Sequence, residues 1–186
     1  MIDHEQTHHC CRGRGHRNGG GERPGQGHRH SHDDAECALN APLDADPPLT
    51  AEAEAAVLAA LDDEYHARAF YRAVMRRFGE VQPFSHIEQS ESRHIAALTR
   101  VLKHYGRTTP ADPHDGSPAI ESAVPGAFAQ ACAAAERAEV DNDLLYQEKL
   151  LPQVRDYPGI AAVFSRLMEA SRERHRPAFG RWAADR

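Results

Sequence analysis

Apolar side chains recur every three or four residues through four stretches of this chain, which is the spacing of residues on one face of an α-helix. The pattern predicts helices over residues 51–78, 84–105 and 159–183, and a further one from 120 or 124 to 150. Each helix would turn one stripe of side chains towards a shared interior. The four stripes are Val57, Leu61, Glu64, Arg68, Tyr71, Met75 and Phe78; Phe84, Ile87, Glu91, His94, Leu98, Val101 and Tyr105; Phe128, Cys132, Ala135, Glu139, Asn142 and Tyr146; and Ile160, Phe164, Leu167, Ser171, His175 and Trp182.

Capping and helix-breaking residues indicate where these helices begin and end. Thr50 is a suitable N-cap for the first helix. Gly79 and Gly106 would close the first two helices, and Pro125 falls in the first turn of the third. Pro177 should bend the fourth helix, because its ring clashes with the carbonyl group four residues earlier.

The lengths of the connections predict how the helices are arranged. Residues 79–83 form a short link and residues 152–158 another, so each link should join two antiparallel neighbours. Residues 106–119, rich in Pro, Gly and Asp, form a long connection between the two pairs. Two helical hairpins joined by one long crossover predict an all-α fold, an antiparallel four-helix bundle over residues 49–186.

The first 48 residues have a different composition from the rest of the chain. They contain almost no Val, Ile, Leu or Phe, but seven of the thirteen His and three of the four Cys. Ordering them would cost conformational entropy with little apolar burial to offset it, so residues 1–48 are predicted to be a disordered tail. The tract His8-His9-Cys10-Cys11 and the trio His28, His30 and His32 could capture metal ions. An extension without a function is the alternative interpretation.

Charge and hydropathy exclude several classes of protein. The formal net charge is −6 and no face is basic, which argues against nucleic acid as a partner. No run approaches the roughly 18 apolar residues of a membrane span, so no membrane partner is expected. No secretory signal is recognisable at the start, and the cysteines do not form a disulfide framework, which together predict a cytoplasmic setting. Self-association as a homodimer stays open.

Five ionisable residues stand near the middle of the predicted stripes and would face the interior. They are Glu64, Glu91, His94, Glu139 and His175. An isolated buried carboxylate costs too much free energy to stand alone, so it must be protonated, paired with a cation or bound to a metal. Oxygen ligands combined with imidazole suit iron, manganese or zinc. These five residues are therefore predicted to bind a metal.

A metal-free interior is the alternative prediction. Arg68 stands one turn from Glu64, and Arg172 and Arg174 lie close to His175 in the sequence. Their guanidinium groups could neutralise the glutamates and form a salt-bridged polar core. In that case the helices would serve as an interaction module.

Four segments of the predicted helices carry motifs in a fixed order. They are residues 64–71 (EYHARAFY), 84–94 (FSHIEQSESRH), 138–146 (AEVDNDLLY) and 170–179 (ASRERHRPAF). Together they resemble the ferritin-like superfamily and, within it, a rubrerythrin-like bacterial family of unknown function. The resemblance implies a ferritin-like four-helix bundle over residues 49–186 and a non-haem iron centre of one or two ions.

The implied activity is peroxide reduction or iron oxidation. The implied ligands are Glu64, Glu91, His94, Glu139 and His175, with Arg68 and Asn142 around them. Because the chain has no rubredoxin-like domain with a four-cysteine iron site, an external electron donor would be needed. A protein that sequesters metal is the alternative.

One position departs from the superfamily's pattern of two Glu-x-x-His motifs. Arg172 stands three residues before His175, where the second motif needs its glutamate, and Glu173 comes one position late. The departure predicts one tightly bound ion and a weaker second one. It also predicts that Arg172 turns to solvent or pairs with a core glutamate such as Glu139.

Other reactive side chains are interpreted as structural. Tyr71 and Tyr146 are predicted to be core residues, with a redox relay as the alternative. Cys132 is predicted to be a small buried residue, and His66 is predicted to lie at the surface.

Overall fold

The computed structural model describes residues 39–183, which fold as an all-α protein. Of the described residues 74 % are helical and none is in a strand. None of the helices in this range has the length and apolar character needed to cross a membrane. The elements are α2 (Ala51–Phe78), α3 (Phe84–His104), α4 (Pro118–Ala123), α5 (Phe128–Leu145), the π-helical turn η1 (Tyr146–Leu150), α6 (Leu151–Gln153), α7 (Pro158–Ala170), the π-helical turn η2 (Ser171–His175) and α8 (Arg176–Ala183).

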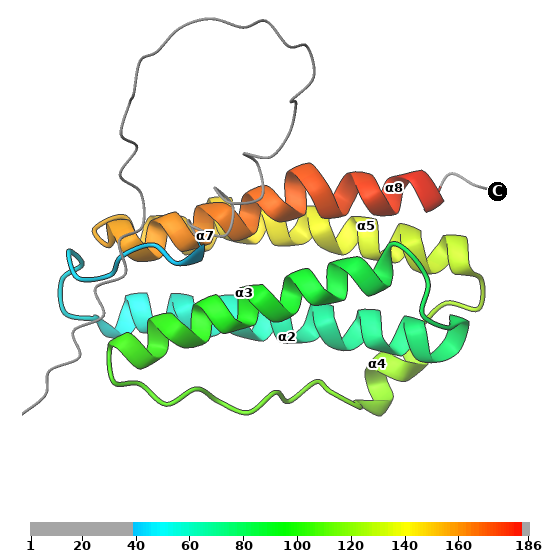
Figure 1. The fold of residues 1–186 in the computed structure, drawn as a ribbon, viewed down its shortest axis with the longest axis horizontal. Helices are drawn as coiled ribbons and strands as arrows, with labels where there is room; N and C mark the ends of the chain where they lie inside the picture. Colours follow the sequence, from blue (N-terminus) through cyan, green and yellow to red (C-terminus); the bar gives the residue numbers. More distant parts are fainter. Residues whose placement is uncertain (1–38, 184–186) are drawn as a thin grey trace, which may run out of the picture.

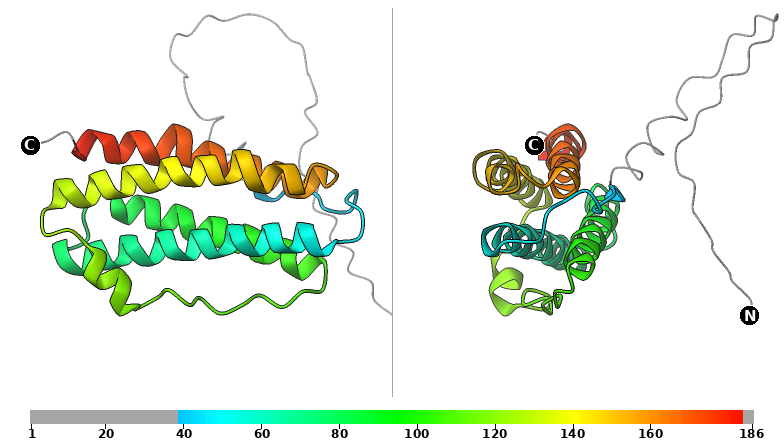
Figure 2. Two further views of the ribbon diagram at one scale, coloured as in Figure 1. Left: turned by 180° about the vertical axis from the view of Figure 1, so that it is seen from behind. Right: turned by 90° about the vertical axis from the view of Figure 1, so that its left-hand side faces the viewer.

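The long helical segments lie side by side (Figures 1 and 2). α5, η1 and α6 follow one another without a break, as do α7, η2 and α8, so each set makes one continuous segment. α2 packs along α3, and α5 packs along α8. The long connection between α3 and α4 runs beside α2, where Tyr65 donates a hydrogen bond to the carbonyl oxygen of Pro110 at 3.2 Å and Arg68 pairs with Asp112 at 2.9 Å.

The ends of α2 follow the predicted capping chemistry. The hydroxyl oxygen of Thr50 accepts a hydrogen bond from the backbone N–H of Ala53 at 3.2 Å. Gly79 follows the helix with a φ of 88°, and its N–H donates to the carbonyl oxygen of Met75 at 2.8 Å. A positive φ is readily adopted only by glycine, which explains why the helix ends there.

Apolar residues form two separate core clusters, one towards each end of the long segments. One cluster contains Leu61, Leu98 and Phe164, and the other contains Tyr71 and Phe84. Each fully buried side chain of this size stabilises the fold by about 1.5–3 kcal/mol. On every long segment the buried acids and histidines lie between the residues of the two clusters. The polar layer is therefore held in place by apolar packing on both sides.

Residues 39–48 were assigned by composition to the tail, and the structure corrects that boundary. Ala41 and Leu43 are buried in the first core cluster. The guanidinium group of Arg100 donates to the carbonyl oxygens of Leu39 and Ala41 at 3.0 and 3.1 Å. These few apolar residues find partners that a count of composition does not show. The prediction for residues 1–38 lies outside the described residues.

The carboxylate of Asp46 caps the start of α7. Its oxygens accept hydrogen bonds from the backbone N–H groups of Gly159 at 2.7 Å and Ile160 at 3.1 Å. We expect Asp46→Ala to lower the free energy of unfolding by about 1–2 kcal/mol, because two amides at the helix start lose their acceptor. Urea denaturation of the metal-free protein measures this. Asp44→Ala is the matched control, since Asp44 is exposed, and equal losses in both variants would contradict the assignment.

The third helix begins later than its sequence predicts. The short helix α4 ends at Ala123, and α5 starts at Phe128, so Pro125 lies between two helices rather than in a first turn. The link predicted to start at Pro152 is also shorter, because α6 continues to Gln153. Trp182 is 42 % exposed, although its stripe predicts burial. It lies in the last turn of α8, with its ring edge-on to the ring of Phe128.

Two π-helical turns interrupt the long segments at the level of the polar layer. In η1 the N–H of Leu151 donates to the carbonyl oxygen of Tyr146, and in η2 the N–H of Arg176 donates to that of Ser171. Each bond spans five residues instead of four, so each turn takes up one additional residue. η2 ends two residues before Pro177, the residue predicted to disturb this helix.

Candidate metal centre

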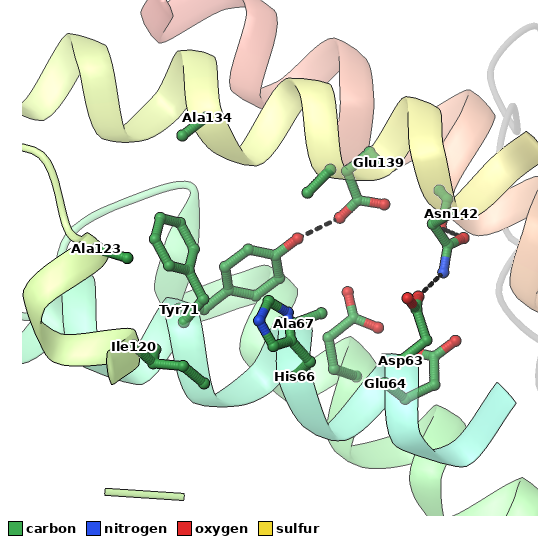
Figure 3. Close-up of a pocket in the computed structure, with 14 residues that line it drawn as sticks. Asp63, Glu64, His66, Ala67, Tyr71, Ile120, Ala123, Ala134, Glu139 and Asn142 are labelled. Carbon is green, nitrogen blue, oxygen red and sulfur yellow. Dashed lines mark hydrogen bonds between the residues drawn. The ribbon is translucent and has the colours of Figure 1, made fainter. Parts of the chain in front are cut away.

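The structure brings all five predicted residues together in one buried layer. α2 supplies Glu64, α3 supplies Glu91 and His94, α5 supplies Glu139, and His175 is the last residue of η2. Each is only 2–3 % exposed. Figure 3 shows Glu64 and Glu139 reaching from α2 and α5 into the same space. The helical spacing of the acids and histidines therefore identified a real cluster of side chains.

Glu91 stands between two pairs of side chains and belongs to both. Its Oε2 lies 2.8 Å from Nδ1 of His94, which is also 3.0 Å from Oε2 of Glu64. Its Oε1 lies 3.1 Å from Nδ1 of His175, which is also 3.5 Å from Oε1 of Glu139. The result is two groups that could each hold an ion, Glu64–Glu91–His94 and Glu91–Glu139–His175, with Glu91 shared.

The separations within each group fit metal ligation. Ligand atoms about 2.0–2.2 Å from an ion, at roughly right angles to each other, lie about 3 Å apart. The four nitrogen–oxygen separations given above are between 2.8 and 3.5 Å. Nδ1 of His175 is buried and has no hydrogen-bond partner, although two carboxylate oxygens lie near it. A nitrogen that approaches two oxygens without hydrogen-bond geometry is placed as a metal ligand would be, and carboxylate with imidazole suits iron, manganese or zinc.

Without a metal, the charges of this layer are balanced by protons. Burial raises the pKa of Glu64 to about 8, although His94 opposes the rise. Burial alone would lower the pKa of His94, but Glu64 and Glu91 raise it to about 9. Burial alone would also lower the pKa of His175. Glu91 and Glu139 outweigh burial and raise this pKa to about 10. The pKa of Glu91 is held well below its usual value because His175 and His94 outweigh the effect of burial.

Two tyrosines hold the outer glutamates in a reciprocal arrangement. The hydroxyl of Tyr71 in α2 donates to Oε1 of Glu139 at 2.5 Å, and the hydroxyl of Tyr146 in η1 donates to Oε1 of Glu64 at 2.9 Å. Each tyrosine stands seven residues after the glutamate of its own helix and binds the glutamate of the other. Burial and the neighbouring carboxylates raise the pKa of both phenols well above 10, so both remain donors.

A second polar chain beside the centre was not predicted. The hydroxyl of Ser171 donates to Oδ1 of Asn142 at 2.7 Å, and Nδ2 of Asn142 donates to Oδ2 of Asp63 at 2.6 Å. Asn142 was expected to lie around the ligands, and its side-chain hydrogen bonds are with Ser171 and Asp63. Burial raises the pKa of Asp63. Ser171 stood on the predicted interior stripe, four positions before His175, but spacing along one helix did not reveal its hydrogen bond to Asn142 of another.

The arginines near the centre point away from it. Arg68 pairs with Asp112 at 2.9 Å and Arg172 pairs with Asp143 at 2.7 Å, so the ion pair of each guanidinium group is with an aspartate outside the five central residues. Arg172 turns outward, as one of its two predicted outcomes required, and its partner is Asp143 rather than Glu139. Among residues 39–183 the ion pairs recorded for the central glutamates are with histidines. The arginine-neutralised core is therefore not what these residues form.

Other sequence predictions concern single side chains. Tyr71 and Tyr146 are fully buried core residues, as predicted, although their bonds to glutamates were missed. Cys132 is buried and free, and burial raises the pKa of its thiol to about 11. His66 is exposed, as predicted. These three predictions of burial or exposure are confirmed.

A cavity of about 280 Å³ leads from the surface to the carboxylates. Its inner end is lined by the buried Glu64, Glu91, Glu139 and Tyr71, and its outer end by the exposed His66 and Ala123. Figure 3 shows the side chains of Glu64, Tyr71 and Glu139 among those that line it. The helices α2, α4 and α5 surround it. The complete lining is Asp63, Glu64, His66, Ala67, Phe70, Tyr71, Glu91, Ile120, Ala123, Ala134, Ala138, Glu139, Asn142 and Ser171.

Comparison of the chain with protein-family models, with curated proteins and with solved structures found no match.

Proposed function

We propose that this chain is a non-haem metal protein whose centre holds up to two ions, with iron as the first candidate and manganese or zinc as alternatives. The observation that supports this most strongly is Glu91, which offers one oxygen to each of two glutamate–histidine pairs. The buried Nδ1 of His175, close to two carboxylates without a hydrogen bond, adds to it. Ions in these positions would replace the protons that otherwise balance the layer.

We further propose that the fold is a ferritin-like bundle of the rubrerythrin type. Support comes from the two packed pairs, α2 with α3 and α5 with α8, joined by one long crossover. The short helix α4 would be an addition within that crossover. In this arrangement each of the four long segments contributes at least one of the five polar side chains.

The proposed activity is the reduction of a peroxide, with iron oxidation as the accompanying change. Iron(II) bound there would supply the two electrons that split the O–O bond, each ion becoming iron(III), with two protons completing two waters from hydrogen peroxide or an alcohol and a water from an organic hydroperoxide. The chain's part is to hold and orient the ligands. Tyr146 binds one oxygen of Glu64 and leaves the other facing His94. Tyr71 holds Glu139 through Oε1, the same oxygen that lies 3.5 Å from Nδ1 of His175.

Return of the iron to the ferrous state would require electrons from another molecule. Cys132 is the free cysteine of residues 39–183, so this part of the chain has no four-cysteine site for electron transfer. An external donor is therefore part of the proposal.

Anaerobic loading with iron(II), followed by one equivalent of hydrogen peroxide, tests the function. We expect the protein to consume one peroxide for every two iron(II) ions oxidised, measured by peroxide assay and by the near-ultraviolet absorbance of iron(III). The rate of peroxide consumption should be at least about 10-fold lower in His175→Ala, because one ion loses its imidazole ligand. His104→Ala is the control, since His104 is exposed and remote in sequence from the centre.

Comparing His175→Ala with His104→Ala also corrects for any iron bound by residues 1–38. Any iron held by histidines of residues 1–38 is the same in both variants, so only a difference between them reports on the centre. Equal peroxide consumption by His175→Ala and the unaltered chain would refute the proposal. Iron retained at the centre without peroxide consumption would favour metal sequestration instead.

A further inference from the structure

The cavity beside the centre is much larger than hydrogen peroxide requires. A cavity of about 150 Å³ is enough to bind benzene, and a single water needs only about 10–15 Å³ of such volume. The cavity here measures about 280 Å³. A molecule of two oxygen atoms would leave most of it without contacts. The volume therefore fits an organic molecule about the size of a substituted benzene ring.

The outer wall of the cavity is apolar and made largely of small residues. Ala67, Ala123, Ala134 and Ala138 line it together with the larger Phe70 and Ile120. Alanine side chains at these positions leave the space open, and Figure 3 shows Ala134 and Ala123 facing each other across it. A ligand body in contact with this wall would gain free energy through the area that it removes from water.

The inner end of the cavity carries the opposite chemistry. Glu64, Glu91 and Glu139 bring carboxylate oxygens to it. The hydroxyl of Tyr71, the phenol in the lining, already donates a hydrogen bond to Glu139. These three carboxyl groups face the cavity, whereas His94 and His175 do not line it, so this end offers mainly hydrogen-bond acceptors to a ligand. It suits a neutral group with an O–H donor better than a carboxylate group of the same size, which brings only acceptors.

We propose that this cavity binds a neutral organic hydroperoxide with a small apolar body, its O–O–H group directed to the carboxylates and its body against the alanines. The proposal rests on the proposed function and names the substrate class of the same site. An organic hydroperoxide of this kind would be preferred over hydrogen peroxide, because only the organic compound fills the apolar part.

Binding to the metal-free protein tests the proposal independently of any reaction. Benzyl alcohol serves as a non-reacting probe with an apolar ring and one O–H donor, and benzoate serves as its anionic counterpart. Titration calorimetry or ligand-observed NMR gives the dissociation constants. We expect benzyl alcohol to bind at least about 10-fold more tightly than benzoate, a difference of about 1.4 kcal/mol.

Ala134→Phe places a ring inside the cavity and should raise the dissociation constant of benzyl alcohol at least about 10-fold. Ala59→Phe is the matched control, because Ala59 is exposed on α2 and does not line the cavity. Should Ala134→Phe fail to fold, which helical circular dichroism would show, Ala123→Phe replaces it, since Ala123 also lines the cavity and is exposed. In the iron-loaded protein the filling variant should lower kcat/KM for cumene hydroperoxide by a larger factor than for hydrogen peroxide, because the smaller peroxide makes little contact with the apolar wall.

The possible results separate this inference from the proposed function. Tight binding of benzyl alcohol to the unaltered chain and to Ala59→Phe, lost in the filling variant, supports the cavity as a ligand site even where no metal binds. A protein that binds iron but binds benzyl alcohol no better than benzoate overturns the inference and leaves the metal centre intact. Equal affinity for benzyl alcohol in the unaltered and filled proteins also overturns it.

Discussion

Replacing Glu91 with glutamine is expected to weaken both metal-binding positions at once, whereas Glu64→Gln or Glu139→Gln weakens one. Glu91 supplies an oxygen to each glutamate–histidine pair, and Glu64 and Glu139 serve one pair each. Loss of a partner outside the ligand shell already lowers metal affinity about 10–100-fold, so loss of a shared ligand should cost about 100-fold or more at both positions. Anaerobic equilibrium dialysis with iron(II), followed by elemental analysis, measures the number of ions held per chain.

The unaltered chain should bind a first ion tightly and a second more weakly, because three carboxylates cannot fully balance two divalent ions. Glu173→Gln is the matched control. Glu173 belongs to η2 but is exposed, so its loss should change neither position. If Glu91→Gln removed only as much metal as Glu64→Gln does, the two groups would be independent and the shared role of Glu91 would be wrong.

Metal binding at neutral pH is expected to release at least about two protons per chain when both positions fill. The pKa values of His94 and His175 are raised to about 9 and 10, because carboxylates adjoin both rings, so both histidines carry protons at pH 7 in the metal-free protein. Ligation requires each to be deprotonated. Calorimetric titrations in two buffers of different ionisation enthalpy give the number of protons released. A release near zero would show that the ions bind elsewhere.

The same pKa shifts determine how the metal-free protein responds to pH. The pKa of His94 rises from 6.5 to about 9 on folding, so its contribution to stability is complete below pH 6.5 and is lost as the pH rises to about 9. The raised pKa of Glu64 acts in the same direction between 4.5 and about 8. The melting temperature of the metal-free protein should therefore fall from pH 6 to pH 9, while the stabilisation by added metal grows. His175→Ala should reduce both changes.

The helices and the five polar side chains could be predicted because they depend on local spacing. Glu91 and His94 are one turn apart on α3, and Glu64 and Glu139 fall at the same height of their own helices. A stripe that is apolar on both sides of such residues places them in the interior. Two apolar clusters with a polar layer between them are the direct result of that pattern.

The remaining features depend on contacts that spacing does not encode. Side-chain pattern alone does not distinguish the π-turn η2 from α-helix, and it does not show that Arg172 pairs with Asp143. The cavity exists because α4 lies beside α2, and the position of α4 is set by the long connection before it. Asp46 reaches the start of α7 across 113 residues of sequence. Each of these requires the chain to be folded before it can be seen.

The reciprocal bonds of Tyr71 and Tyr146 give the two halves of the centre the same plan. In α2 a glutamate is followed seven residues later by a tyrosine, and α5 with η1 repeats that order with Glu139 and Tyr146. A single hairpin with one such helix and one histidine helix would build an equivalent centre by pairing with a copy of itself. The second half departs from this plan at one position, since Arg172 stands three residues before His175 where the first half has Glu91 before His94.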